Sequence, residues 1–424
     1  MASNVRPGAS AAPDGVGPDR IRNVVLVGHA GSGKTTLAEA VLVETGAITR
    51  AGRVEDGATV CDHEEVERRL GRSVSLAVAA TGHEGVKINL VDTPGHADFV
   101  GEVRAGLRAA DAALFVVSAV DGIDGTTRML WEECAAVGMP RAVVVTHVDQ
   151  QRGDFGDALE ICQRAFGEGV QPLYLTLLGD DELPAGLIGL LSQTVFDYSG
   201  GQRGRRPADD AQREAVAEQR SALIEGIIQE SEDDSLLERW LEGEDVGFDT
   251  LVADLETAVA RGSFHPVLPV VAASGLGIGE LLEVITRGFP SPLEHPLPTV
   301  TTPDGDPREA ISCDPGGSLV AEVVKTTSDP YVGRLSLVRV FSGSLAADLT
   351  VHVSGHFSRF SGTANGDGGH ADHDVDERVG AVSTPLGATL SAAAAGRAGD
   401  IVAVARLSRA ETGDTLSDIA APAL

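Results

Sequence analysis

A glycine-rich loop carries the strongest chemical signal in the chain. Gly28-His29-Ala30-Gly31-Ser32-Gly33-Lys34-Thr35 satisfies the pattern G-x-x-x-x-G-K-[ST] between an apolar run and a helix-like stretch. In this pattern backbone N–H groups surround phosphate oxygens, the lysine contacts the β- and γ-phosphates, and the hydroxyl ligates Mg²⁺. Lysine occurs only at positions 34, 87 and 325, which argues against a chance match in a chain with 51 glycines. The loop predicts a site for a nucleoside triphosphate and Mg²⁺.

A second motif supplies a carboxylate for the metal. Asp92-Thr93-Pro94-Gly95 follows the apolar run Ile88–Val91. An aspartate at such a strand end has the Walker-B role of holding Mg²⁺. The N–H of Gly95 can bind a γ-phosphate and move when that phosphate leaves, which is the behaviour of a switch.

A third motif bears on the base of the nucleotide. Thr146-His147-Val148-Asp149 lies where GTPases have N-K-x-D. Its aspartate can accept hydrogen bonds from guanine N1 and N2, donors that adenine lacks. Because Thr146 and His147 replace Asn and Lys, a simple Asp turn remains an alternative for this motif.

The elements that must position these motifs alternate along the chain. Short apolar runs predict buried strands, and helix-like stretches separate them, which is typical of an α/β fold with a doubly wound parallel sheet. Ligands of such sheets lie at the carboxyl ends of the strands. The expected strands are Val24–Val27, Ile88–Val91, Ala112–Val117, Ala142–Val145 and Leu268–Val271, and the expected helices are Thr35–Glu44, Phe99–Ala110, Thr126–Val137 and Phe155–Phe166.

The texture of the sequence divides the rest of the chain. We expect a disordered tail over residues 1–20, a P-loop domain over 21–290 with an α+β insertion at about 155–266, and a proline-rich linker over 291–309. The insertion has an expected strand at Pro172–Leu178, a polar break at 203–207 and acidic helices at Asp209–Glu230 and Ser235–Leu241. Residues 310–424 predict a small antiparallel β-barrel. Its expected strands are Leu319–Lys325, Arg334–Phe341, Leu349–Ser354, Val379–Val382 and Ile401–Ala405.

Composition excludes several classes of protein. The 33 Lys and Arg against 63 Asp and Glu give a net charge of −30, which argues against autonomous binding to DNA or RNA by a diffuse basic surface. No apolar stretch is long enough to span a membrane. Four scattered cysteines predict reduced, buried thiols in a cytoplasmic protein.

A histidine- and aspartate-containing stretch needs separate treatment. Residues 361–376 are rich in Gly, Asp and His and predict a long exposed loop. A metal site at His370, Asp372, His373 and Asp374 is the alternative, although nothing in the sequence holds these side chains on one element.

Taken together, the motifs resemble the translational GTPases. The resemblance is carried by Gly28–Thr36 and by Asp92-Thr93-Pro94-Gly95-His96-Ala97-Asp98-Phe99. The insertion after Asp149 is similar in place and size to the G-prime subdomain of elongation factor G, which elongation factor Tu lacks. Residues 328–335 and 339–343 resemble the start of that family's second-domain barrel, and residues 413–416 resemble its closing segment.

The resemblance implies a ribosome-associated, monomeric, cytoplasmic GTPase that uses GTP/GDP and Mg²⁺. His96 falls on the family's catalytic histidine, which orients the attacking water. Ser73, within Gly71–Ser75, stands where the family has a Mg²⁺-binding switch threonine, with Ser75 as an alternative. The implied metal ligands are therefore Thr35, Ser73 and Asp92. The implied nucleotide contacts are Gly28, His29, Ala30, Gly31, Ser32, Gly33, Lys34, Thr35, Thr36, Asp92, Gly95, Thr146, His147, Asp149, Ser274 and Gly275.

Departures from the family pattern leave other functions open. The family has an aspartate at Gly31 and apolar residues at Ala30 and Arg72, positions that shape the pocket around the attacking water. A paralogue of elongation factor G is therefore the leading interpretation. The alternatives are a nucleotide-dependent ribosome- or partner-binding module with little hydrolysis, an ATPase of related fold, and a tetracycline-protection factor. The family has three further domains, so a truncated form is a simpler expectation than a natural two-domain protein.

Overall fold

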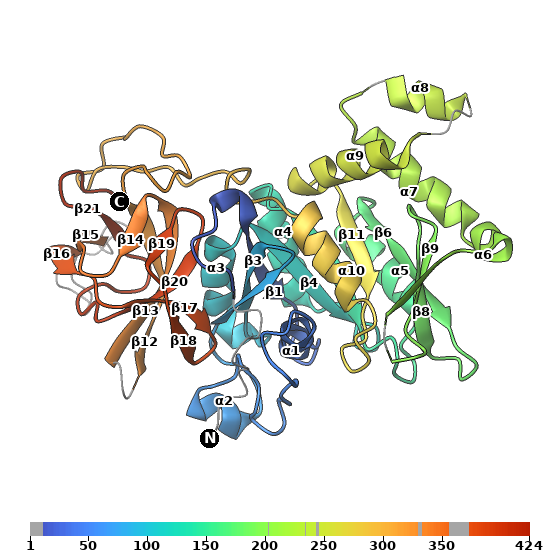
Figure 1. The fold of residues 1–424 in the computed structure, drawn as a ribbon, viewed down its shortest axis with the longest axis horizontal. Helices are drawn as coiled ribbons and strands as arrows, with labels where there is room; N and C mark the ends of the chain where they lie inside the picture. The colour runs from blue at the N-terminus through green and yellow to red at the C-terminus, as the bar shows by residue number, and fades with distance from the viewer. Residues whose placement is uncertain (1–11, 202, 234, 243–245, 330–332, 356–372) are drawn as a thin grey trace.

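The computed structural model of the 424-residue chain describes residues 12–201, 203–233, 235–242, 246–329, 333–355 and 373–424. An α/β domain lies between a β-rich domain and an inserted unit (Figure 1). No described helix combines the length and the apolar character that crossing a bilayer requires.

The α/β domain is built on a sheet with the strand order β2-β3-β1-β4-β5-β11-β6. Neighbours in this order are parallel, except that β2 pairs antiparallel with β3. All positions of β4 and β5 are buried, as expected for a sheet covered on both faces. The strands are β1 Ile21–Val27, β2 Ala77–His83, β3 Val86–Asp92, β4 Ala112–Ser118, β5 Arg141–Thr146, β6 Val170–Pro172 and β11 His265–Pro269.

Helices of this domain begin where local capping favours them. The side chain of Asp124 accepts a hydrogen bond from the N–H of Thr127, and Asp154 accepts one from the N–H of Asp157. Such N-caps satisfy backbone donors that a helix start leaves free. The helices are α1 Lys34–Glu44, α2 Glu65–Leu70, α3 Val100–Ala109, α4 Gly125–Ala136, α5 Phe155–Phe166 and α10 Ile278–Glu283, and η2 Ala97–Phe99 and η3 Val284–Gly288 are short turns. The predicted α/β fold class is confirmed.

The inserted unit contains a sheet that the sequence only partly predicts. Its antiparallel order is β10-β9-β8-β7, with β7 Tyr174–Leu178, β8 Pro184–Gly189, β9 Thr194–Asp197 and β10 Gly204–Pro207. The expected polar break at 203–207 is wrong, because Gly204–Pro207 pairs with β9 as an exposed edge strand. Charged side chains are tolerated there because an edge strand is solvated. The helices are α6 Asp210–Ala215, α7 Ala217–Gln229, α8 Ser235–Leu241 and α9 Phe248–Ala260.

The β-rich domain packs around its own apolar core, which includes Val323, Val338 and Leu416. Its strands are antiparallel and run in the order β16-β15-β21-β12-β13-β20-β17, with β18 on β17 and β14 paired with β19. They are β12 Val320–Asp329, β13 Gly333–Ser342, β14 Ser344–Ala346, β15 Thr350–Gly355, β16 His373–Arg378, β17 Val382–Leu386, β18 Thr389–Ala392, β19 Ala395–Arg397, β20 Ile401–Ala405 and β21 Thr415–Asp418.

Two loop predictions need correction. Residues 373–376 belong to strand β16, which pairs with β15, so the expected exposed loop does not extend over them. Of the expected strand Val379–Val382, only Val382 lies in a strand, as the first residue of β17, and the residues before it connect β16 to β17. His370 and Asp372 lie outside the described residues.

The expected tail is ordered near the domain. Residues 1–11 lie outside the described part, whereas Pro18–Arg20 forms a 3-10 turn, η1, and Arg397 donates to the carbonyl of Gly15 at 2.8 Å. The prediction of disorder is therefore wrong for this stretch, because the β-rich domain binds it. The predicted cysteine state is confirmed, since all four thiols are free and buried.

Candidate functional site

The glycine-rich loop connects β1 to α1. At three of its positions the backbone geometry requires glycine. Gly31 and Gly33 adopt φ angles of 85° and 89°, which other residues rarely adopt. A Cβ on Gly28 would lie 2.3 Å from the carbonyl oxygen of Val116. The loop therefore lies directly against β4 and leaves its backbone N–H groups ahead of α1.

Lys34 lies inside this loop. Its Nζ donates to the carbonyl oxygens of Gly28 and His29 at 2.8 and 2.9 Å. Burial lowers the pKa of Lys34 to about 8, although the charges of Asp92, Asp124 and Asp62 raise it. The ammonium is held where the loop would enclose phosphate oxygens.

Thr35, Ser73 and Asp92 come together from three separate segments. The Thr35 hydroxyl donates to Asp92 Oδ2 at 2.7 Å and lies 3.3 Å from Ser73 Oγ. Burial raises the pKa of Asp92 to about 7, against the hydrogen bond from Thr35 and the charge of Lys34. Asp92 Oδ1 and Ser32 Oγ are buried and have no hydrogen-bond partner in the described structure.

These oxygens fit Mg²⁺, which prefers hard oxygen ligands and usually combines one or two carboxylates with substrate phosphates. The orphaned Oδ1 of Asp92 offers a free acceptor for the metal or its water. Among the described residues no group of three His, Cys, Asp or Glu side chains could hold a metal alone. A bound cation here would therefore share its coordination with phosphate oxygens.

The structure separates the two switch serines. Ser73 Oγ faces Thr35, whereas Ser75 Oγ bonds to Lys325 Nζ and Glu64. Ser73 is thus the hydroxyl that the fold places beside Thr35 and Asp92.

The turn after β3 touches the glycine-rich loop. A Cβ on Gly95 would lie 2.5 Å from Ala30 N and from the carbonyl carbon of His29. The next residue, His96, has a side chain 42% exposed, and its Nδ1 lies 3.3 Å from Asp98 Oδ2. His96 therefore lies next to the loop and is turned toward Asp98.

The expected base-binding residues occupy the carboxyl ends of two neighbouring parallel strands, β5 and β11. The hydroxyl of Thr146 lies 2.8 Å from the carbonyl oxygen of Ser32, which ties this end of the sheet to the phosphate loop. His147 adopts a φ of 59°, and its Nδ1 is 3.1 Å from Ser118 Oγ. Asp149 is half-buried on the following turn, while Ser274 and Gly275 form the turn after β11.

Sequence patterns missed some residues of the site. Asp62 is 3% exposed, its Oδ2 is buried without a partner, and its charge acts on both Lys34 and Asp92. Asp124, the cap of α4, also acts on Lys34. No motif marks either residue, and only the fold brings them to the loop.

The alternative metal set in the β-rich domain does not converge. His373 Nδ1 lies 2.6 Å from Asp414 Oδ2, whereas Asp374 lies 2.9 Å from His352. Adjacent residues of a strand point to opposite faces, so these two side chains diverge.

A strand, a glycine-rich loop and a helix, with a hydroxyl and a carboxylate beside the loop, define the class of P-loop nucleoside-triphosphatase folds. The family described as the elongation factor Tu GTP binding domain matches residues 19–291, so the chain belongs to that family.

Related proteins extend the likeness beyond that domain. The chain is 59% identical over 421 residues to an "Elongation factor G-like protein" of Mycobacterium tuberculosis, in the strains CDC 1551 / Oshkosh and ATCC 25618 / H37Rv. This match covers 99% of the chain and 58% of each relative. A crystal structure of a Thermus thermophilus protein matches with a TM-score of 0.78 and 32% identity, covering 94% of this chain and 54% of that one. The chain thus spans a little over half the length of these relatives and is elongation factor G-like in sequence and fold.

Proposed function

We propose that the chain binds GTP with Mg²⁺ and hydrolyses GTP to GDP and phosphate as a ribosome-associated translation factor of the elongation factor G type. The observation that carries this proposal is the convergence of Lys34, Thr35 and Asp92 at the glycine-rich loop. The family assignment and the printed name of the Mycobacterium relatives support it. The proposal includes two domains, a GTPase domain at residues 21–290 and a β-barrel domain at residues 310–424.

Each residue has a role in this mechanism. Lys34 would offset charge on the β- and γ-phosphates, and Thr35, Ser73 and Asp92 would hold Mg²⁺. When bound, the metal would neutralise charge that develops on the phosphate oxygens. The N–H of Gly95 binds the γ-phosphate. When that phosphate leaves after hydrolysis, the turn after β3 is released.

Hydrolysis requires a positioned water. His96 follows Gly95, and since its Nδ1 faces Asp98, Nε2 is the atom available to orient water. The exposed ring must turn toward the loop, and a partner that presses on this surface would favour that movement.

Selectivity for guanine is assigned to Asp149, with Ser274 and Gly275 beside the base. The ribosome is the proposed partner, and the protein acts as a monomer in the cytoplasm. Because the net charge is −30, any docking on RNA relies on a few arginines at specific positions.

The test measures GTP turnover with and without ribosomes for the wild type and His96→Ala. We expect ribosomes to stimulate the wild type, and His96→Ala to lower stimulated turnover by about 100-fold or more with nucleotide affinity unchanged. Equal turnover in both proteins would remove the catalytic assignment of His96.

A second candidate is a nucleotide-dependent binding module without productive hydrolysis. The space around Gly31 is open where the family has an aspartate, and the His96 side chain is turned toward Asp98. Binding to ribosomes with GTP but no stimulation at any ribosome concentration would favour this function. ATP competing as well as GTP would instead favour an ATPase.

A further inference from the structure

The β-rich domain contacts the segment that carries Ser73. This segment, residues 48–76, is the larger part of the connection from α1 to β2 and includes α2. Glu67 of α2 accepts a hydrogen bond from the N–H of Val74 at 3.1 Å, and Ser73 lies against Thr35. Ser73 is thus held on one side by Thr35 and by Glu67 through Val74, and the two residues that follow Val74 have a separate contact.

Lys325 of β12 holds those residues. Its Nζ donates to Ser75 Oγ and to the carbonyl oxygen of Leu76, the latter at 2.7 Å. Glu64 and Glu102 place carboxylate oxygens 3.8 and 4.0 Å from the same ammonium. The lysine is 9% exposed, so these acceptors take the place of its water.

Lys325 also lies close to the helix that follows the turn of Gly95 and His96. Glu102 belongs to α3, the helix that follows the turn of Gly95 and His96, and it accepts the N–H of Leu76 at 2.8 Å. Lys325 thus lies where β12, α3 and the end of the Ser73 segment meet.

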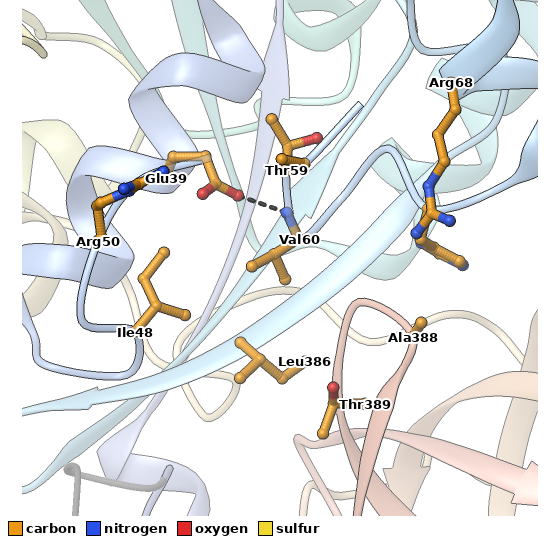
Figure 2. A pocket seen from close by; sticks show the side chains of 11 residues that line it. Glu39, Ile48, Arg50, Thr59, Val60, Arg68, Leu386, Ala388 and Thr389 are labelled. Atoms are coloured by element: carbon orange, nitrogen blue, oxygen red, sulfur yellow. Dashed lines mark hydrogen bonds between the residues drawn. The ribbon is translucent and has the colours of Figure 1, made fainter. Parts of the chain in front are cut away.

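A second contact of the β-rich domain reaches strand β2, just after the segment, and the first half of the segment. The turn between β17 and β18 places the N–H of Gly387 3.0 Å from the carbonyl of Val78, and a Cβ on Gly387 would lie 2.0 Å from the carbonyl oxygen of Val60. Figure 2 shows Leu386, Ala388 and Thr389 facing Ile48 and Val60 across a pocket of about 190 Å³.

We propose that Lys325 is a positioning residue through which the β-rich domain holds Ser73 beside Thr35 when GTP is bound. The inference rests on the proposed function, because it concerns the regulation of the same site.

The segment contains its own reporter. Arg68, Arg69 and Arg72 are exposed, and trypsin cleaves after arginine only where the backbone can open. Cleavage after these three residues, followed by mass spectrometry in the full chain, measures how firmly the segment is held.

With Mg²⁺ and a non-hydrolysable GTP analogue, we expect Lys325→Met to be cleaved there about five-fold or more faster than the wild type. The affinity for the GTP analogue should fall relative to the affinity for GDP, because only the triphosphate state engages Ser73. Ser75→Ala removes one acceptor of the same lysine and should act in the same direction more weakly. The double variant should match Lys325→Met, since the two residues form one contact.

Arg108→Gln is the matched control. Arg108 of α3 pairs with Glu322 of β12 at 2.9 Å, so this variant removes an ion pair between the same two elements without touching residues 48–76. If Lys325→Met and Ser75→Ala still bind GTP and are cleaved at the wild-type rate, the inference is wrong and the proposed function is unaffected. A wild type that binds no guanine nucleotide would overturn the proposed function, and the cleavage of the nucleotide-free proteins would then still report on the contact.

Discussion

Three lysines stand among thirty arginines, and each lysine is buried at a different junction. Lys34 fills the glycine-rich loop, Lys87 pairs with Asp400, and Lys325 binds the end of the Ser73 segment. An ammonium carries three donors on one atom, so it can bind acceptors that converge on a single point. Buried cations are not confined to lysine, because Arg141 and Arg339 are also buried.

Asp149 provides a test of base recognition. Asp149→Asn replaces an acceptor-only carboxylate by an amide, so guanine N1 and N2 lose a partner and GTP affinity should fall about 100-fold or more. A xanthine nucleotide, which has a carbonyl at position 2, should gain affinity. Equilibrium titration with both nucleotides measures the change. Asp154→Asn is the control, because Asn also caps a helix and this position is exposed. Equal GTP affinity in Asp149→Asn and wild type would exclude Asp149 from base recognition.

Loops that connect well-predicted elements carry most of the site. The helices α1 and α5 begin and end within one residue of their predicted bounds. For α5 the reason is local, because its apolar residues recur at helical spacing and Asp154 caps its start. By contrast, α2 has only six residues and depends on the buried Glu67, which bonds to both Glu64 and Val74. A helix this short has little stability of its own, so no pattern in the sequence predicts it.

Gly28 tests the close approach of the loop to β4. In Gly28→Ala the added methyl would meet the carbonyl oxygen of Val116, and we expect a loss of about 1–3 kcal/mol in the free energy of unfolding together with weaker nucleotide binding. Gly125→Ala, at the start of α4 with open space around it, should cost nothing. Denaturant unfolding of both variants checks the comparison. If Gly28→Ala were as stable as Gly125→Ala, the loop would not approach β4 as closely as the structure shows.

His265 at the start of β11 makes stability depend on pH. Burial lowers its pKa to about 3, and the charge of Arg141 acts in the same direction. Below the unfolded pKa of about 6.5 the unfolded chain binds a proton that the folded chain does not, so stability falls as pH falls through this range.

His265→Phe removes this contribution and retains a ring beside Trp131. Between pH 7.5 and 5.5 the wild type should lose about 1.4 kcal/mol more than the variant. The difference between their unfolding free energies cancels the opposite effect of carboxyl groups whose pKa is raised. A wild type that loses no more than the variant would contradict the assignment.

The two domains meet through buried charges. Lys87 Nζ donates to Asp400 Oδ2 at 2.8 Å, and Arg339 donates to Asp111 Oδ1 at 2.7 Å. Asn23 of β1 adds a hydrogen bond to the carbonyl of Gly399 at 2.8 Å. Buried charges need their partners, so such a contact favours one relative orientation of the domains. This fixed orientation is what lets Lys325 act on the Ser73 segment.

Lys87→Met should leave the Asp400 carboxylate buried without its charge partner and cost about 3–5 kcal/mol. Combining it with Asp400→Asn should restore most of the loss, because the amide oxygen still accepts hydrogen bonds from Asn89 and Ile401. Unfolding free energies of the single and double variants measure the coupling. Additive losses would show that the pair contributes no specific interaction.

Short-range patterns were sufficient for the glycine-rich loop, the strand ends at Asp92 and Asp149, and the alternation of strands and helices. Each of these depends on neighbours within a few residues, and so it can be read from a single sequence. The sequence also predicted the β-rich texture after residue 310, although it misplaced the strand at Val379–Val382.

What the sequence left open depends on contacts between distant segments. The choice of Ser73 over Ser75 requires Lys325, which lies 250 positions away along the chain. The ordering of residues near Gly15 requires Arg397, and the electrostatic roles of Asp62 and Asp124 require the loop of Lys34. Periodicity and motif spacing carry no information on such pairs, because they arise only when the sheet and the two domains bring separate segments into contact.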